Sequence, residues 1–260
     1  MPSLTSTVTH ALALASALLL APACRSAAPP TLGELAQESD VEAAGARLVK
    51  LPNGLNRLDQ GDGPPRHAVI AVHGYRTRGK EWVEPLLRLG EREVAVYFYR
   101  WDTRHCPDRA VPRLHDALAR LLAEMPTIER VTIVGHSYGG LVTTLTMQGL
   151  APRVPAELHI VAAPLASMPP LVKLCGFTGV RELPPAGAQT RWHQWRTVHA
   201  QDGAFKSLEV DPQVVTLPGS GVTQLPATLE SGERLGHSRS LTWVVDRLPP
   251  IDGGAPTPEP

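Results

Sequence analysis

The sequence lacks a charge excess, a metal-binding motif and a nucleotide-binding motif. Its 25 Lys and Arg residues balance 25 Asp and Glu residues over 260 positions. Without a basic surface to attract it, nucleic acid is not an expected partner. No Cys/His cluster has zinc-site spacing, and neither a P-loop nor a G-x-G-x-x-G after a strand occurs. The sequence therefore predicts chemistry that needs side chains and water alone, with no metal and no cofactor.

The apolar run over residues 11–20 is too short for a membrane-spanning helix. Together with the small residues that follow, it fits the apolar region and cleavage site of a secretory signal peptide, although no Lys or Arg precedes it. Residues 20–24 also resemble the processing box of bacterial lipoproteins, which implies that Cys24 becomes a lipidated first residue. We therefore expect a signal peptide over residues 1–24 and export of the protein. The mature chain would be periplasmic, anchored to a membrane through Cys24, or secreted.

Two cysteines remain once Cys24 is set aside. Cys106 and Cys175 form an even pair in a compartment that permits disulfides, so a bridge between them is one hypothesis. Two ordinary buried thiols are the alternative, because a sequence does not give the distance between them.

Length and composition predict one folded domain. A chain of 260 residues with 43% hydrophobic side chains can bury one sizeable core. We expect a linker over residues 25–45, the domain over residues 46–250 and a disordered tail over residues 251–260. Asn53-Gly54 lies between two alternating runs and predicts a β-hairpin where the domain begins.

Strand-like and helix-like segments alternate along this domain, as apolar runs and apolar residues at helical spacing indicate. The expected strands cover residues 67–72, 93–98, 130–134, 158–163, a segment near 197–198, and 214–217. The expected helices cover residues 80–89, 108–125, the segment after 137, and 238–248. This rhythm predicts an α/β fold with a mostly parallel sheet and helices on both faces.

A serine between two glycines stands where a strand-like run meets a helix-forming segment. In the sequence Gly-His-Ser-Tyr-Gly over residues 135–139, the glycines leave room for a tight turn that exposes the serine hydroxyl. This order predicts a nucleophile elbow with Ser137 as the nucleophile. Ser238 follows a similar Gly-His pair, but it lacks the second glycine and the preceding β-branched run, so it is a poor candidate.

A His-Gly turn ends the strand expected over residues 67–72. Its glycine lets the next backbone N–H groups turn toward the site, where acyl transfer needs fixed donors for an oxyanion. The backbone N–H groups of Tyr75 and Tyr138 are the candidate donors. Taken without Ser137, the same dipeptide also fits a plain exit from a strand.

These motifs make residues 67–148 similar to the α/β-hydrolases, in which a His-Gly oxyanion turn precedes the elbow by one βα unit. Residues 99–102, Tyr-Arg-Trp-Asp, with the amphipathic helix after them, further resemble the branch of bacterial lipases and lecithin:cholesterol acyltransferase. The family order is nucleophile, acid, histidine. The family also inserts cap or lid elements where residues 164–195 lie here, which implies a cap-like insertion that helps to shape an acyl pocket. A structural excursion with no lid motion is the alternative, because length and composition do not reveal mobility.

The resemblance favours His237 among ten histidines as the catalytic base. His237 follows the expected last strand and directly precedes a helix, which is where the family places this residue. The alternatives are less well placed, because His159 lies inside an apolar strand and His193 and His199 precede the last strand. A role for His237 as a helix cap or a surface residue also remains open.

Asp202 is the expected acid, because it lies in a turn just after the strand near residues 197–198, where the family places a carboxylate. Asp211 and Glu209 lie between the same two strands and remain alternatives, since strand boundaries read from sequence shift by a few residues. The Asp202-Gly203 pair also fits a plain tight turn.

The resemblance thus implies a serine hydrolase that cleaves carboxylic esters of small molecules or lipids through an acyl-enzyme on Ser137. A thioesterase, an amidase or an acyltransferase would use the same residues. A catalytically silent binding protein of this fold is the alternative from another class, and the intact Ser137, His237 and oxyanion turn argue against it.

Overall fold

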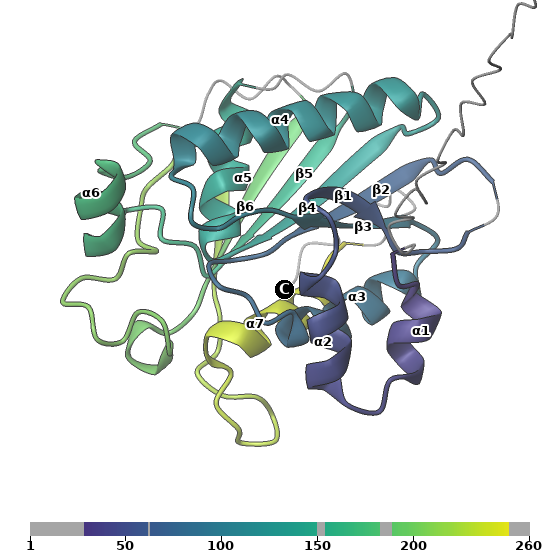
Figure 1. Ribbon diagram of the computed structural model, residues 1–260. Helices are drawn as coiled ribbons and strands as arrows, with labels where there is room; N and C mark the ends of the chain where they lie inside the picture. Colours follow the sequence, from purple (N-terminus) through teal and green to yellow (C-terminus); the bar gives the residue numbers. More distant parts are fainter. Residues whose placement is uncertain (1–28, 62, 150–153, 183–188, 250–260) are drawn as a thin grey trace, which may run out of the picture.

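A seven-stranded sheet forms the centre of the computed structural model, which describes residues 29–61, 63–149, 154–182 and 189–249 (Figure 1). The strands are β1 (Gly54–Arg57), β2 (His67–Val72), β3 (Ala95–Arg100), β4 (Arg130–His136), β5 (Ala156–Val161), β6 (Thr190–Arg196) and β7 (Ser220–Gln224). They lie in the order β1-β3-β2-β4-β5-β6-β7. Among the six strand pairs of the sheet in the described ranges, β1–β3 alone is antiparallel, which confirms the expected mostly parallel sheet.

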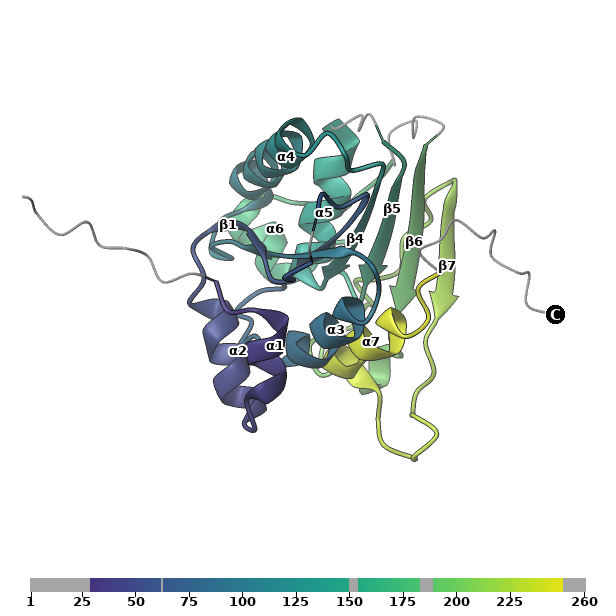
Figure 2. The same cartoon turned by 90° about the vertical axis from the view of Figure 1, so that its right-hand side faces the viewer.

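Helices cover both faces of this sheet (Figures 1 and 2). The helices are α1 (Leu32–Gln37), α2 (Val41–Val49), α3 (Lys80–Gly90), α4 (Pro107–Glu124), α5 (Tyr138–Gly149), α6 (Pro169–Cys175) and α7 (Gly236–Val245), with a short 3-10 helix η1 (His199–Gln201). Alternate side chains of β2 point to opposite faces of the sheet. Ile70 and Val72 pack with α4 and α5, whereas Val69 and Ala71 pack with α3 and α7. A strand buried on both sides reads as a continuous apolar run, as β2 does.

The N-terminal part of the domain differs from the expectation. Residues 32–45, expected to belong to a linker, form α1 and part of α2, which pack against α3 (Figure 2). Leu35 and Leu48 are fully buried there, and a Cβ on Gly45 would lie 2.3 Å from the backbone nitrogen of Lys80. The linker prediction is wrong over these residues, because Ala and Glu suit helices as well as tethers.

The hairpin expected around Asn53-Gly54 is also wrong. Its first expected arm belongs to the end of α2, and β1 pairs with β3, where Gly54 lies opposite Arg100. The turn is held instead by Asn56, whose side-chain amide donates to the carbonyl oxygens of Pro52 and Gly54.

Several boundaries move in the C-terminal half, and the strand expected near residues 197–198 is β6, which ends at Arg196. Residues 190–195 belong to β6, so the stretch expected as a cap-like insertion ends before them and contains α6. The last strand is β7 rather than residues 214–217, which lie in a loop where Val214 is exposed. The β-branched pair Val214-Val215 mimics a strand, while the sequence Ser-Gly-Val-Thr-Gln of β7 carries almost no apolar pattern.

A disulfide joins Cys106 to Cys175, whose Cα atoms lie 5.5 Å apart. It links the start of α4 to the end of α6, so the bridge is confirmed over the alternative of two free thiols. Cys24, the expected signal peptide and the expected tail lie outside the described residues. Within the described ranges, the structure has no helix that is both long and apolar enough to cross a membrane.

Candidate active site

The carboxyl ends of four parallel strands carry the predicted site residues to one edge of the sheet. Gly74 follows β2, Ser137 follows β4, Asp202 follows β6, and His237 follows β7. Open α/β sheets form their sites at this edge, where the loops after neighbouring strands meet. Ser137 and His237 line a common cavity of about 260 Å³, together with Gly74 and Tyr75.

Ser137 occupies a strained turn between β4 and α5. Its φ of 53° lies in the left-handed region, which a residue with a Cβ adopts only when its surroundings impose it. The backbone N–H of Ser137 donates to the carbonyl oxygen of Val161 at 2.9 Å, and its own carbonyl accepts from Gly140 at 3.0 Å. A strained serine between a strand and a helix is the geometry of a nucleophile elbow.

Two glycines allow the elbow and the His-Gly turn to lie in contact. A Cβ on Gly139 would lie 2.4 Å from the carbonyl oxygens of Val72 and His73, and a Cβ on Gly74 would lie 2.9 Å from the Cβ of Ser137. Neither position has room for a side chain. The turn that carries Tyr75 is therefore held directly beside the serine.

His237 and Asp202 form the hydrogen bond that a base and its orienting acid require. Nδ1 of His237 lies 2.8 Å from Oδ2 of Asp202, so the imidazole donates its Nδ1 proton and presents Nε2 on the other side of the ring. The Asp202 side chain is fully buried, and 15% of the His237 side chain is exposed. Phe205 packs edge-on against the ring, with the two centroids 5.0 Å apart.

Four hydrogen bonds surround the carboxylate of Asp202. Oδ1 accepts from the backbone N–H groups of Ala204 and Phe205 at 2.8 and 3.2 Å, and Oδ2 accepts from His237 and from the hydroxyl of Thr197. Burial acts to raise the pKa of Asp202, but these hydrogen bonds outweigh it and hold the pKa below its usual value. Asp202 is therefore a buried carboxylate that stays ionised near neutral pH.

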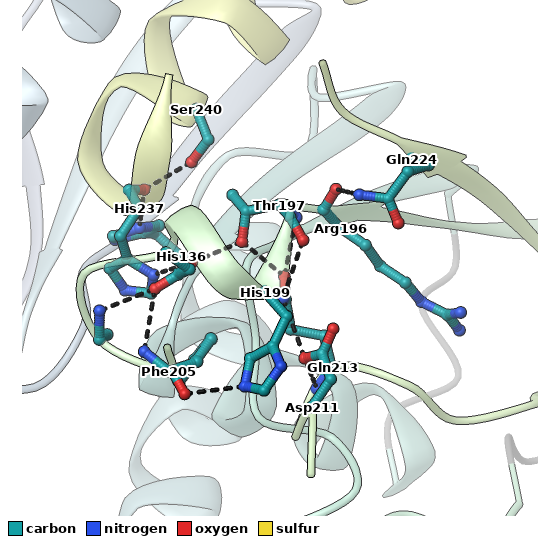
Figure 3. A network of polar contacts seen from close by, with 12 residues as sticks. His136, Arg196, Thr197, His199, Phe205, Asp211, Gln213, Gln224, His237 and Ser240 are labelled. Carbon is teal, nitrogen blue, oxygen red and sulfur yellow. Dashed lines mark hydrogen bonds and ion pairs between the residues drawn. The ribbon is translucent and has the colours of Figure 1, made fainter. Parts of the chain in front are cut away.

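Asp211 reaches His237 only through a chain of hydrogen bonds that runs over Gln213, Thr197 and Asp202 (Figure 3). Its carboxylate accepts from the backbone N–H and the side-chain amide of Gln213 at 3.0 and 3.1 Å. Oε1 of Gln213 accepts in turn from the backbone N–H of Thr197 at 2.9 Å. Asp211 thus supports the Thr197 segment rather than the imidazole. Glu209, the other alternative acid, has an exposed side chain. Sequence reasoning missed Thr197 and Gln213, because no motif marks polar residues that reach a site through a second residue.

His136, the residue before Ser137, holds the backbone of His237. Its Nε2 lies 3.0 Å from the carbonyl oxygen of His237, which also accepts from the hydroxyl of Ser240 at 2.6 Å. Burial, assisted by the nearby His237, lowers the pKa of His136 to about 3, so the ring is neutral and donates through Nε2–H. The element with the nucleophile is therefore hydrogen-bonded to the start of α7.

The side chain of His73, the histidine of the His-Gly turn, is a buried packing group. Its ring stacks on Phe98 and Trp101 at centroid distances of 5.5 and 5.8 Å, and the indole N–H of Trp101 donates to the His73 carbonyl oxygen at 3.0 Å. Burial lowers the pKa of His73 to about 4, which leaves the ring neutral. These contacts fix the strand end from which Gly74 and Tyr75 turn into the site.

The side chain of Tyr138 points away from the site and donates its hydroxyl proton to the carbonyl oxygen of His105 at 2.7 Å. Its backbone N–H, in contrast, belongs to the first residue of α5 and has no carbonyl partner within that helix. The donor of Tyr138 that is left without a helical partner is therefore its main-chain N–H, directly after Ser137.

The other candidate histidines have different partners. His159 accepts from the indole N–H of Trp195 at 3.2 Å, and Nε2 of His193 lies 2.8 Å from the hydroxyl of Thr223. His199 donates to a backbone carbonyl oxygen in the loop after Asp202. In the part of the chain that the structure describes, no group of three His, Cys, Asp or Glu side chains could hold a metal ion.

The sequence of the folded domain matches a family model over residues 69–255, which is described as the alpha/beta hydrolase family. The chain belongs to the alpha/beta hydrolase family. The match spans Ser137, Asp202 and His237, and it agrees with the mostly parallel sheet. It identifies the superfamily as a whole rather than the branch of lipases and lecithin:cholesterol acyltransferase.

Similar solved structures are distant in sequence. XC6422 from Xanthomonas campestris, described as an a/b serine hydrolase without lid, is 17% identical with a TM-score of 0.47, over 74% of this hydrolase and 83% of that chain. Est1E from Butyrivibrio proteoclasticus is 13% identical with a TM-score of 0.48, over 74% and 90%. The Pyrococcus furiosus esterase Pf2001 is 13% identical with a TM-score of 0.46, over 70% and 79%. No curated protein matches the sequence.

Proposed function

We propose that this hydrolase cleaves carboxylic esters through an acyl-enzyme on Ser137. The observation that carries the proposal is the 2.8 Å hydrogen bond between His237 and Asp202, at a cavity that Ser137 and His237 line together. A serine hydroxyl is a weak nucleophile until a base takes its proton, and the base works best when a carboxylate orients it.

In the first half of the reaction, Ser137 Oγ attacks the ester carbonyl carbon while Nε2 of His237 accepts the hydroxyl proton. The tetrahedral intermediate then collapses: the bond to the leaving oxygen breaks, and the imidazolium returns the proton to the departing alcohol. In the second half, His237 takes a proton from water, which attacks the acyl carbon. The carboxylic acid leaves, and the proton returns to Ser137. Asp202, ionised and buried, stabilises the imidazolium in both halves.

The backbone N–H groups of Tyr75 and Tyr138 would hold the negative oxygen of both tetrahedral intermediates. The contact between Gly74 and Ser137 supports this role, because it keeps the Tyr75 turn beside the reacting carbonyl. Main-chain donors need no reorganisation as the charge develops, and one such donor contributes about 3–4 kcal/mol to transition-state stabilisation.

Esters are easier substrates for this arrangement than amides, because resonance stabilises an ester carbonyl less and an alkoxide is a better leaving group than an amide anion. Labelling with a fluorophosphonate probe tests the nucleophile: wild-type protein should be labelled and the folded Ser137→Ala variant should not. Failure of folded wild-type protein to react would overturn the proposal in favour of a silent binding protein.

A panel of p-nitrophenyl esters of increasing acyl length, with matched thioesters and amides, tests the substrate class. We expect turnover of the oxyesters, lost in the Ser137→Ala variant. Rapid thioester cleavage with negligible oxyester turnover would replace the esterase by a thioesterase. A steep rise in rate with long acyl chains would identify a lipid ester as the substrate.

We also propose that the protein is exported and anchored through a lipid on Cys24. The disulfide between Cys106 and Cys175 supports export, since such bonds persist in oxidising compartments. Expression with its own leader in a bacterial host should give a membrane-associated chain that begins at a diacylated Cys24. A Cys24→Ala variant should leave the membrane fraction. An unprocessed leader on a protein that stays inside the cell would contradict this proposal.

A further inference from the structure

Basic side chains are among those that line the cavity of Ser137. Arg76, Arg78 and Lys80 line it from the turn after β2 and the start of α3. An adjoining hollow, which shares His237 and Ser238 with this cavity, is lined by Arg234 and Arg239, from the end of the β7–α7 loop and from α7. His237 and Ser238 line both hollows, so the reacting imidazole lies between two groups of cations.

Two of these cations are neutralised by neighbouring carboxylates. The ammonium group of Lys80 contacts Glu42, and the guanidinium group of Arg239 lies 3.1 Å from Glu233. Among the residues that line the two hollows, the single carboxylate is that of Glu81, which already accepts a hydrogen bond from the hydroxyl of Thr77.

Within the described ranges, the guanidinium groups of Arg76, Arg78 and Arg234 have no carboxylate partner. The Arg76 guanidinium lies 5.3 Å from the centre of the ring of its neighbour Tyr75. Its backbone is fixed as well, with a φ of 49° and an N–H group that donates to the hydroxyl of Thr103 at 3.2 Å. An uncompensated cation is thus built into the turn that carries the candidate oxyanion donor.

Unpaired guanidinium groups at the mouth of a site select for anions. A guanidinium offers several N–H donors in a flat fork, which fits a carboxylate or a phosphate better than a neutral group. Positive charges on both sides of the reacting imidazole also raise the local concentration of a negative substrate. A neutral ester gains neither effect.

We propose that the natural substrate is an ester that carries a carboxylate or a phosphate close to the scissile bond, and that Arg76 and Arg78 bind this anion. Both line the cavity of Ser137, whereas Arg234 lines the adjoining hollow and adds to the positive field. The proposal rests on the esterase function and names the substrate class of that same site. Carboxylate and phosphate share the recognising chemistry.

The test compares matched esters that differ in charge. The p-nitrophenyl monoester of succinate and an ester with a terminal phosphate are set against the p-nitrophenyl ester of methyl succinate, which is neutral. We expect kcat/KM for at least one anionic ester to exceed that for the neutral ester by about tenfold, which corresponds to about one charge-assisted hydrogen bond. The excess should appear in KM and should shrink as added salt screens the charges.

The Arg76→Gln/Arg78→Gln double variant should bring the ratio of anionic to neutral kcat/KM close to one. Arg66→Gln removes an exposed positive charge just before β2, at the opposite edge of the sheet, and should leave the ratio as in the wild type. An equal effect of Arg66→Gln, or a wild-type ratio near one, would overturn the proposal. The carboxylate and phosphate arms tell which anion is preferred.

The neutral ester separates this proposal from the esterase function. Turnover of the neutral ester with no preference for the anions would remove the anion site and leave the esterase intact. Should no ester react, binding of succinate and of inorganic phosphate to the Ser137→Ala variant, measured by calorimetry, still decides the matter. We then expect the Ser137→Ala variant to bind at least one of the two anions, and this binding to be lost when Arg76→Gln and Arg78→Gln are added. If the Ser137→Ala variant binds neither anion, the proposed anion site is wrong.

Discussion

Nδ1 of His237 lies 2.8 Å from a carboxylate oxygen of Asp202, although 35 positions separate the two residues in the sequence. The loops after β6 and β7 bring them together, and the strand-to-helix turn after β4 adds Ser137 at the same sheet edge. Each of these groups comes from a different loop, so the sheet determines the geometry of the site.

The choice of acid can be tested by replacing each carboxylate in turn. Asp202→Asn should lower kcat by about 10³- to 10⁴-fold, because the imidazole loses both its orientation and the partner of its charged form. Asp211→Asn should cost less than about tenfold, since Asp211 contacts Gln213 and not His237. Ester hydrolysis by the two folded variants decides between them, and the reverse order of effects would make Asp211 the acid.

The packing of the elbow predicts a large cost for a single methyl group. Gly139→Ala would place a Cβ 2.4 Å from two backbone carbonyl oxygens, so we expect a loss of about 2–3 kcal/mol in the free energy of unfolding, or no soluble protein. Gly33→Ala is the matched control, because a Cβ at Gly33 meets only the Thr31 hydroxyl oxygen, at 3.8 Å. Urea denaturation measures both variants. A similar stability for the two would contradict the tight contact.

The sequence predicted the parts of the site that follow a local rule. Ser137 and the His-Gly turn depend on short motifs, and His237 and Asp202 depend on the order in which an α/β-hydrolase places its residues after successive strands. The fold class could likewise be predicted from the alternation of strand-like and helix-like segments. These predictions stay correct even when the expected ends of strands and helices are wrong by a few residues.

Other features could not be predicted, because they depend on contacts that have no sequence period. The fully buried Leu35 and Leu48 pack α1 and α2 on the domain, yet the surrounding Ala and Glu residues suit a tether equally well. The edge strand β7 lacks an apolar pattern. The loop before it contains the β-branched pair Val214-Val215, which is typical of a strand, although Val214 is exposed. Thr197 becomes part of the site only through its hydrogen bond to Asp202.

The disulfide between Cys106 and Cys175 should contribute strongly to stability. It closes a loop with a sequence separation of 69, for which the loss of entropy in the unfolded chain is worth about 4 kcal/mol. The Cys106→Ser/Cys175→Ser variant should therefore unfold at a lower urea concentration. Reductant added to the wild type should reproduce that shift and leave the variant unchanged. Equal stability of the oxidised and reduced wild type would argue against the bridge.

Buried neutral histidines predict a loss of stability in acid. Burial lowers the pKa of His67 and His73 to about 4 and that of His136 and His159 to about 3. Between the ordinary pKa near 6.5 and these values, the unfolded chain binds protons that the folded protein does not. The stabilisation is therefore complete above about pH 6.5 and falls below it, with a slope approaching about 1.4 kcal/mol per pH unit for each histidine.

Urea denaturation at a series of pH values between neutral and about pH 4.5 measures this slope. His159→Leu should reduce the slope by the share of one histidine, whatever its effect on stability at neutral pH. The variant separates titration from packing, because the loss of the Trp195 hydrogen bond to His159 does not depend on pH in this range. A stability that is flat across this range would rule out the neutral histidines.

The hydrogen bond from His136 to the main chain of His237 has a consequence for how the protein can vary. The residue beside the nucleophile fixes the backbone of the proposed base, so the path of the proton between Ser137 and His237 depends on β4 rather than on the chain that leads from β7 to α7. The exposed residues 230–233 of that connection can therefore lengthen, shorten or change sequence while the two reacting atoms keep their separation, whereas Leu225 and Leu235 are buried in the core and hold its two ends. New substrate contacts can be introduced there without disturbing the chemistry.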